Sequence, residues 1–480
     1  MATKPTTVVL FGATGDLARR KLLPGLLHLF KTGLLPELRV VGTSLDDHDR
    51  ESFVAFAHQA MVEFAGDDGD METWPDFAKL VHWAPGSSGA EGLRTAVAEA
   101  EAEWKGQDIG RLHYLSVPPS AALTVVDLLE SADLVNGSRI IMEKPFGTDL
   151  ESARHLNGQL HAVFQEEQIF RIDHFLGKEA AQNILAFRFA NGLFEPIWHR
   201  NHIDHVQIDV PESLGLEQRA SFYEATGAYR DMVVTHLFQV LAFTAMEPPT
   251  ALEPYAISEE KNKVFRSMSP IDPGDVVRGQ YVGYRDINGV AADSETETFI
   301  ALKCFIDNWR WAGVPFYLRT GKRMAEGARI ISIAFKEPPR SMFPPGSGVG
   351  DHGPDHLTFD LADQAKMSLS FYGKKPGPGM RLDKLSMQFA MHDTGWAGAV
   401  LEAYERLIYD AARGDRTLFT TASGIERLWE VSAPLLDNPS IVRPYAPGSW
   451  GPNQIHQLVA PFAWRLPFER VWRDPNSAGG

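Results

Sequence analysis

Hydrophobic positions in the first third of the chain follow two alternating periods. Residues 7–11 form a short run of mostly β-branched residues, and residues 16–31 then place leucines at helical spacing. Strands that alternate with helices predict a parallel sheet with right-handed crossovers, so we expect an N-terminal doubly wound Rossmann domain over residues 1–177. The predicted strand and helix pairs are residues 7–11 with 16–31, 38–43 with 50–61, 112–117 with 119–129, and 139–142 with 150–164.

The pattern changes after residue 177. Strand-like runs follow one another there with turn signals and without helices between many of them. This predicts a larger α+β domain, residues 178–480, built on a mainly antiparallel sheet with helices. The predicted helices are 178–190, 223–245, 400–412 and 423–436, and the predicted strands are 206–210, 278–284, 298–304, 316–319, 330–335, 356–361, 367–372 and 385–391.

Composition narrows the function classes. The net charge of −16 disfavours binding to nucleic acid, because proteins that bind phosphate backbones usually present basic faces. No apolar stretch approaches the length of a membrane span, so we expect a cytoplasmic protein that binds neither nucleic acid nor membrane. An anionic substrate would need locally clustered Lys, Arg and His residues against this global charge.

One such cluster lies in residues 171–179, with the sequence RIDHFLGKE. Adjacent side chains of an extended segment point to opposite faces, so Asp173 and His174 can serve different tasks. A turn with surface ion pairs is the alternative interpretation. However, RIDHFLGKE closely resembles the active-site signature of the bacterial-type glucose-6-phosphate dehydrogenase family, and other parts of that family's pattern recur in order along nearly the whole chain.

A glycine-rich turn, GATGDLA, lies between the first predicted strand and helix. Small residues let backbone N–H groups approach a pyrophosphate at the positive end of the helix dipole. With the following RRKLLP, this turn resembles the family's nucleotide fingerprint. The predicted cofactor-binding residues in it are Gly12, Ala13, Thr14, Gly15, Asp16 and Leu17.

The segment after the second predicted strand departs from the family. The resemblance implies an arginine that holds the 2′-phosphate of NADP, but Leu45 stands at that position. Asp46 and Asp47 follow, and carboxylates favour the ribose hydroxyls of NAD. The resemblance therefore predicts NADP, the local residues favour NAD, and both cofactors stay open. Other cations that can supply the missing charge are Arg19, Arg20, Lys21 and Arg50.

Two further cofactor positions follow from the resemblance. Lys144 and Pro145, in the sequence EKP, end the predicted strand 139–142, where ligand sites of open parallel sheets collect. The resemblance implies that Lys144 reaches both the nicotinamide region and the sugar, while Pro145 shapes the hinge between domains. Gly86 and Ser87 align with a loop that contacts the cofactor in the family.

The second domain holds the candidate base. Asp231 and His236 are five residues apart in a predicted α-helix, which corresponds to roughly 140° of rotation, so they do not share one narrow face. A lone histidine among Val and Leu is usually a core residue, but this segment resembles the family's base-bearing helix. An imidazole suits a base that works near neutral pH. The resemblance makes His236 that base and implies that Asp173 hydrogen-bonds it and fixes its tautomer.

The resemblance also supplies a substrate site. His174 and Lys178 would bind a 6-phosphate, Glu212 and Asp231 would hold sugar hydroxyls, and Lys322 and Lys144 would also contact the substrate. Two departures weaken the likeness. Phe175 replaces a usual tyrosine, and Gly327 stands where many bacterial relatives carry a second lysine.

The family resemblance implies oxidation of D-glucose 6-phosphate to 6-phosphoglucono-1,5-lactone with hydride transfer to NAD(P), the first step of the oxidative pentose phosphate pathway. No metal is required, because a hydride acceptor and an imidazole base suffice. Alternatives are a sugar dehydrogenase of the glucose–fructose oxidoreductase type and a non-catalytic nucleotide-sensing paralogue. The family resemblance further implies a homodimer or homotetramer.

Overall fold

The computed structural model describes residues 4–65, 68–216, 219–350, 353–361, 366–390 and 401–465. The chain forms two compact units. The first unit comprises Met1–Gly177, Pro249–Glu259 and Ala397–Glu426, and the second comprises Lys178–Pro248, Glu260–Trp396 and Arg427–Gly480.

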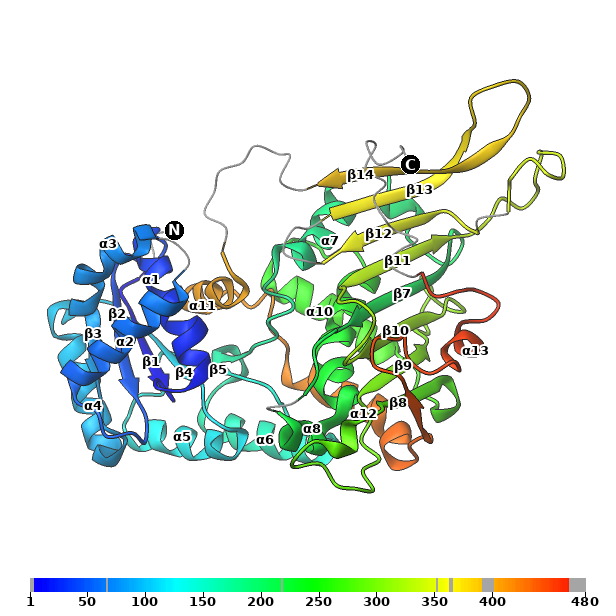
Figure 1. Ribbon diagram of the computed structural model, residues 1–480. Coiled ribbons are helices and arrows are strands. Elements are labelled where there is room, and N and C mark those ends of the chain that lie inside the picture. Colours follow the sequence, from blue (N-terminus) through cyan, green and yellow to red (C-terminus); the bar gives the residue numbers. More distant parts are fainter. Residues whose placement is uncertain are drawn as a thin grey trace. The chain divides into compact units, whose positions relative to one another are not determined.

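A six-stranded parallel sheet forms the centre of the first unit (Figure 1). Its strand order is β3-β2-β1-β4-β5-β6. The chain adds strands toward one edge of the sheet from β1 to β3 and toward the other edge from β4 to β6, as in dinucleotide-binding Rossmann folds. The predicted Rossmann fold is therefore confirmed. The strands are β1 (Thr6–Phe11), β2 (Leu38–Thr43), β3 (Val81–Trp83), β4 (Gly110–Leu115), β5 (Ser138–Met142) and β6 (Ile169–Arg171).

Local signals explain where two helices of this unit begin. The carboxylates of Asp49 and Asp149 accept hydrogen bonds of 2.8 Å from the backbone N–H groups of Ser52 and Ser152, so each helix starts with a capping box. The helices of the unit are η1 (Ala18–Leu22), α1 (Leu23–Lys31), α2 (Arg50–Phe64), α3 (Asp68–Phe77), α4 (Gly89–Ala100), α5 (Pro119–Ser131), α6 (Leu150–Val163) and α11 (Ala403–Arg413), with short turns η2 (Ala78–Leu80), η3 (Gly86–Ser88), η4 (Ala102–Trp104) and η5 (Glu166–Gln168).

Helix α11 joins the first unit from far along the sequence. His28 in α1 and Glu405 in α11 lie 2.8 Å apart (Nδ1 to Oε2), and Arg139 of β5 donates to the carbonyl oxygen of Ala412 at 2.8 Å. Gly414 ends the helix with a positive φ of 76°, a conformation that glycine adopts without steric cost.

The second unit is built on a nine-stranded mixed sheet, ordered β14-β13-β12-β11-β7-β10-β9-β8-β15. Most neighbours are antiparallel, which confirms the predicted second fold, whereas β10 with β7 and β15 with β8 are parallel pairs. The strands are β7 (Ile203–Pro211), β8 (Val276–Tyr281), β9 (Phe299–Cys304), β10 (Phe316–Gly321), β11 (Ile330–Phe335), β12 (His356–Asp360), β13 (Lys366–Lys374), β14 (Leu382–Ala390) and β15 (Val442–Tyr445).

The predicted single helix 223–245 is three helical segments in the structure. Gly227 interrupts it with a φ of 67°, and the middle segment, η7, is a π-helix. The helices of the second unit are α7 (Glu179–Ala190), α8 (Ala220–Ala228), η7 (Tyr229–Leu237), α9 (Phe238–Ala245) and α13 (Ile455–Val459), with short turns η6 (Glu195–Ile197), η8 (Pro273–Asp275) and η9 (Tyr284–Asp286). Helices α10 (Pro254–Ser267) and α12 (Ala422–Asp437) contain residues of both units.

Two ends of predicted elements, Met391 and Val400, lie outside the described residues. Within the described ranges, none of the helices combines the length and the apolar character that crossing a membrane requires.

Candidate active site

The predicted phosphate turn lies at the carboxyl end of β1. Gly12 has a φ of 71°, and a Cβ there would lie 2.2 Å from the carbonyl oxygen of Ser116, so only glycine fits. The backbone N–H groups of Gly12 and Ala13 donate to the carbonyl oxygen of Thr43 at 2.9 and 3.1 Å, which ties the turn to the end of β2. The helix that follows points its positive end at this turn, an arrangement that can hold a pyrophosphate.

The end of β2 carries an acid next to this turn. Asp46 accepts a hydrogen bond from the hydroxyl of Thr14, and its own N–H donates to Oγ of Ser44 at 3.1 Å. Leu45 is 99% exposed and offers no charge. Gly86 packs against the same strand end, because a Cβ there would lie 2.3 Å from the carbonyl oxygen of Ser44.

The EKP segment borders a cavity at the carboxyl ends of β4 and β5. This cavity has a volume of about 200 Å³, and Glu143, Lys144, Thr148 and Ser152 contribute its polar side chains. Burial raises the pKa of Glu143, whereas the hydroxyl of Tyr114, which donates to its carboxylate at 2.7 Å, and the charge of Lys144 lower it. The structure therefore places a half-buried acid directly before the predicted lysine.

A buried arginine fixes the start of the RIDHFLGKE segment. Arg171 is fully buried and donates to Glu166 at 2.9 and 3.1 Å and to Asn157 at 2.8 Å. Two residues later, Asp173 is 2% exposed, and one of its carboxylate oxygens accepts the N–H of Phe175 at 2.9 Å. This segment is thus held by its own backbone and by side chains of the first unit.

His174 lies half-buried between this turn and α11. One of its ring nitrogens lies within 4.8 Å of an Asp173 carboxylate oxygen, and its ring stacks on that of Tyr404. Gly177 also meets α11, since a Cβ there would lie 2.6 Å from the carbonyl oxygen of Ala403. Lys178 follows as the first residue of the second unit and precedes α7.

The sheet of the second unit brings Glu212 and Lys322 together. They follow β7 and β10, which are parallel neighbours with Pro211 opposite Gly321, so both side chains leave the same edge of the sheet. The ammonium group of Lys322 pairs with the carboxylate of Glu212. Sugar hydroxyls can replace such a salt bridge, because they accept hydrogen bonds from a lysine and donate them to a carboxylate.

Tyr223 connects this pair with Asp231. The Lys322 ammonium lies 5.6 Å from the centroid of the Tyr223 ring. Burial raises the pKa of Tyr223 well above its ordinary value, and the nearby carboxylates of Asp231 and Glu212 raise it further. The phenol therefore stays protonated, and it stands among three of the predicted sugar-binding residues.

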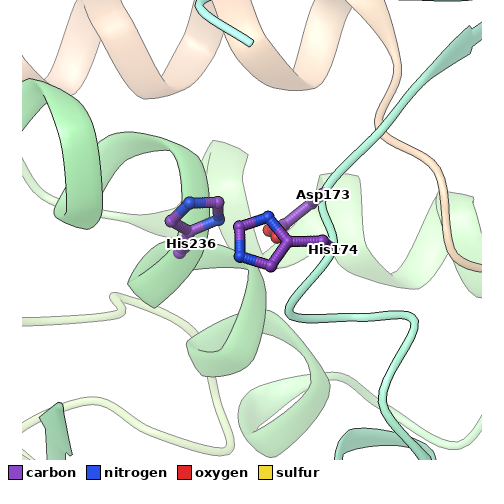
Figure 2. A group of neighbouring side chains, drawn as sticks. All are labelled: Asp173, His174 and His236. Atoms are coloured by element: carbon purple, nitrogen blue, oxygen red, sulfur yellow. The ribbon is translucent and has the colours of Figure 1, made fainter. Parts of the chain in front are cut away.

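The π-helix η7 changes the predicted relation between Asp231 and His236. Hydrogen bonds in a π-helix join residues five apart, so these two residues lie about one turn apart on a similar side, and the α-helical rotation predicted from sequence is wrong here. Asp231 is 8% and His236 1% exposed. Figure 2 shows the imidazole of His236 on η7 and, on the segment after β6, the side chains of Asp173 and His174.

Family models cover nearly all of this framework. The model of the glucose-6-phosphate dehydrogenase NAD binding domain matches residues 9–183, and that of the glucose-6-phosphate dehydrogenase C-terminal domain matches residues 185–466. The chain belongs to the glucose-6-phosphate dehydrogenase family. This confirms the family predicted from RIDHFLGKE and makes the protein an oxidoreductase of the class that acts on a CH–OH group.

Curated members of the glucose-6-phosphate dehydrogenase family match over almost their whole length. The glucose-6-phosphate 1-dehydrogenase of Rhizobium meliloti (strain 1021) is 40% identical, with 95% of this chain and 96% of the relative covered. The glucose-6-phosphate 1-dehydrogenase of Aggregatibacter actinomycetemcomitans is 38% identical, with 99% of each chain covered.

Solved structures of the family share the fold. The crystal structure of glucose-6-phosphate 1-dehydrogenase from Mycobacterium avium has a TM-score of 0.85 and 36% identity, and covers 97% of this chain and 99% of its own. A glucose-6-phosphate dehydrogenase in complex with its substrate glucose-6-phosphate has a TM-score of 0.88 and 32% identity, and covers 96% of this chain and 98% of its own.

Three tyrosines of the candidate site were not predicted from the sequence. Tyr114 contacts Glu143, Tyr223 lies beside Lys322, and Tyr404 stacks on His174. Each approaches its partner only through the tertiary fold, so no local pattern marks them. The two departures from the family lie differently: Phe175 is buried, whereas Gly327 is exposed.

Proposed function

We propose that this protein oxidises D-glucose 6-phosphate at C1 to 6-phosphoglucono-1,5-lactone and transfers the hydride to a nicotinamide cofactor. Matches to both family domains over residues 9–183 and 185–466 carry this proposal. The Rossmann sheet with its phosphate turn supports the cofactor, and the acids and bases of the second unit support a sugar substrate.

His236 is the proposed base. As the C1–H bond breaks and hydride leaves for the nicotinamide, a ring nitrogen of His236 takes the proton of the C1 hydroxyl, and the C1–O bond becomes a carbonyl. Asp173 is proposed to accept the other ring N–H, which fixes the tautomer and stabilises the imidazolium. Both side chains are buried, and burial limits the orientations that each of them can adopt.

The remaining predicted residues bind the substrate in this proposal. His174 and Lys178 bind the 6-phosphate through charge-assisted hydrogen bonds. Glu212, Asp231 and Lys322 hold sugar hydroxyls, and their common neighbourhood around Tyr223 supports this assignment.

The cofactor is NADP or NAD. Its pyrophosphate is proposed to lie on the turn from Gly12 to Leu17, with Gly86 and Ser87 near the adenosine half. Lys144, which borders the cavity after β5, is proposed to contact both the nicotinamide half and the substrate. When bound, the nicotinamide supplies the hydride acceptor.

We further propose a cytoplasmic homo-oligomer, a homodimer or homotetramer, that performs the first step of the oxidative pentose phosphate pathway. Strand β14 at the edge of the nine-stranded sheet supports self-association. It exposes Leu385, Met387 and Phe389 at alternate positions, which share one face of the strand. Exposed apolar patches of this kind mark protein–protein contacts.

One assay tests this function against its alternatives. The formation of NADH and NADPH is followed by absorbance with glucose 6-phosphate, with glucose and without sugar. We expect turnover with glucose 6-phosphate and far less with glucose. Equal rates with both sugars would favour a sugar dehydrogenase of the glucose–fructose oxidoreductase type, and cofactor binding without any turnover would favour a nucleotide-sensing paralogue.

A further inference from the structure

The carboxylate of Asp46 is held in place from two sides. The hydroxyl of Thr14, in the phosphate turn, donates to it, and Oγ of Ser44 lies 3.4 Å from the same oxygen. The backbone is fixed as well, since N–H of Asp46 donates to Ser44 Oγ at 3.1 Å and N–H of His48 donates to the Asp46 carbonyl oxygen at 3.1 Å. The residue nevertheless remains exposed to solvent, so a ligand can reach it.

This carboxylate lies where a dinucleotide's adenosine ribose is bound. In Rossmann folds the pyrophosphate lies on the turn after the first strand, and the ribose lies beside the end of the second. Here the two places are joined directly: Gly12 and Ala13 bond to Thr43 at the end of β2, and the N–H of Gly86 donates to the carbonyl oxygen of Ser44 at 3.1 Å. A ribose that follows a pyrophosphate on this turn would therefore lie near the end of β2, where Asp46 bonds to Thr14 of the turn.

Arg19 and Arg20, two of the cations that could bind a 2′-phosphate, contact other groups. Arg19 forms a salt bridge with Glu63, and its guanidinium lies 5.5 Å from the centroid of the Phe64 ring. Arg20 lies 4.0 Å from the carboxylate of Asp16 and 5.6 Å from the same ring centroid. Both guanidinium groups thus contact residues at the end of α2.

The other two cations are also engaged elsewhere. Lys21 pairs with Glu402 at 2.7 Å. Arg50 donates through Nε to the carbonyl oxygen of Val81 at 2.9 Å and through Nη2 to that of Lys79 at 3.0 Å. Moving either toward β2 would break these contacts, and Leu45, the residue at the usual arginine position, carries no charge.

We propose that Asp46 is the residue that determines cofactor specificity, and that it makes NAD the preferred dinucleotide. Its carboxylate accepts hydrogen bonds from the ribose hydroxyls of NAD, whereas it repels the 2′-phosphate of NADP, which carries a charge of roughly −1.5 to −2. This inference rests on the proposed function, in which the dinucleotide on this turn accepts the hydride.

Binding measurements without turnover test the preference. Isothermal titration of the whole protein with ADP-ribose and with 2′-phospho-ADP-ribose compares the two adenosine halves directly. We expect wild type to bind ADP-ribose at least about tenfold more tightly. Asp46→Asn, which removes the charge and keeps the size, should tighten binding of 2′-phospho-ADP-ribose by about tenfold and weaken that of ADP-ribose.

Asp47→Asn is the matched control, because it makes the same charge change at the next position, which is also exposed. It should alter the ratio of the two affinities by less than about threefold. Tighter binding of 2′-phospho-ADP-ribose by wild type, or an unchanged ratio in Asp46→Asn, would overturn the proposal. If ADP-ribose binds as expected but glucose 6-phosphate is not oxidised, only the proposed function fails; if neither nucleotide binds, both fail.

Discussion

The imidazole ring of His174 stacks on the phenol ring of Tyr404, with ring centroids 5.9 Å apart and an angle of 12° between the planes. His174 follows β6, whereas Tyr404 lies in α11, so the stack joins two segments of the first unit that are far apart in the sequence. Tyr404 therefore orients the imidazole that we propose to bind the 6-phosphate.

Replacing Tyr404 by leucine should weaken substrate binding. An aromatic pair contributes about 0.5–1.5 kcal/mol beyond its buried area, so KM for glucose 6-phosphate should rise by about twofold to tenfold. The value of kcat should fall less, because the contact is made before and during the reaction. Tyr404→Phe keeps the ring and should behave like wild type. Tyr409→Leu, in the same helix, is the control; equal KM values for Tyr404→Leu and this control would contradict the role.

Lys178→Ala should weaken only the binding of the substrate's 6-phosphate group. Loss of one charge-assisted hydrogen bond costs about 1.5–3 kcal/mol, which corresponds to about one to two decades in KM for glucose 6-phosphate. The reaction with unphosphorylated glucose, measured under the same conditions, serves as the control and should hardly change. Equal losses with both sugars would mean that Lys178 does not bind the phosphate.

Leu45→Arg should increase the use of NADP. A guanidinium at this exposed position can reach a 2′-phosphate, and a charged hydrogen bond of about 1.5–3 kcal/mol raises kcat/KM for NADP by about one to two decades. Kinetics with NAD should shift little. Leu193→Arg adds the same charge at another exposed leucine and should leave both cofactors unaffected. An unchanged kcat/KM for NADP in Leu45→Arg would show that another part of the protein holds the phosphate.

Asp410 in α11 should make stability depend on pH. Burial raises the pKa of its carboxyl from 3.8 to about 6, although Arg406 opposes this shift. The native state therefore binds the proton more tightly than the unfolded state, so the stability from this group is full below pH 3.8 and is lost as pH rises to about 6. The asparagine in Asp410→Asn cannot ionise. As the pH rises through this window, the free energy of unfolding of the variant should increase relative to wild type by up to about 3 kcal/mol, which is measured as a growing difference in Tm. A difference in Tm that stays constant with pH would contradict this.

Local sequence predicted those parts of the site that local geometry builds. The turn from Gly12 to Leu17 follows a short apolar strand and precedes an amphipathic helix, so residue types within a few positions fix its shape. Lys144 was likewise expected at a strand end, and it follows β5 in the structure.

Contacts between segments that are far apart in the chain could not be predicted from this one sequence. Tyr404 lies 230 positions after His174, and the helix that carries it joins the Rossmann unit only after folding. The π-helical hydrogen bonds of η7 were also unforeseen, because the spacing of Asp231 and His236 was interpreted with α-helical geometry. The sequence also gives no sign that Arg19 pairs with Glu63 or that Lys21 pairs with Glu402.

The kinetics of His236→Asn test the central claim most directly. Cofactor reduction with saturating glucose 6-phosphate is compared with wild type, while substrate affinity is measured separately by titration. If His236 removes the C1 hydroxyl proton, kcat should fall by about 10²-fold or more, the lower end of the general-base contribution, and affinity should change much less. A folded variant that binds substrate and keeps the wild-type kcat, with chemistry limiting the rate, would contradict the account.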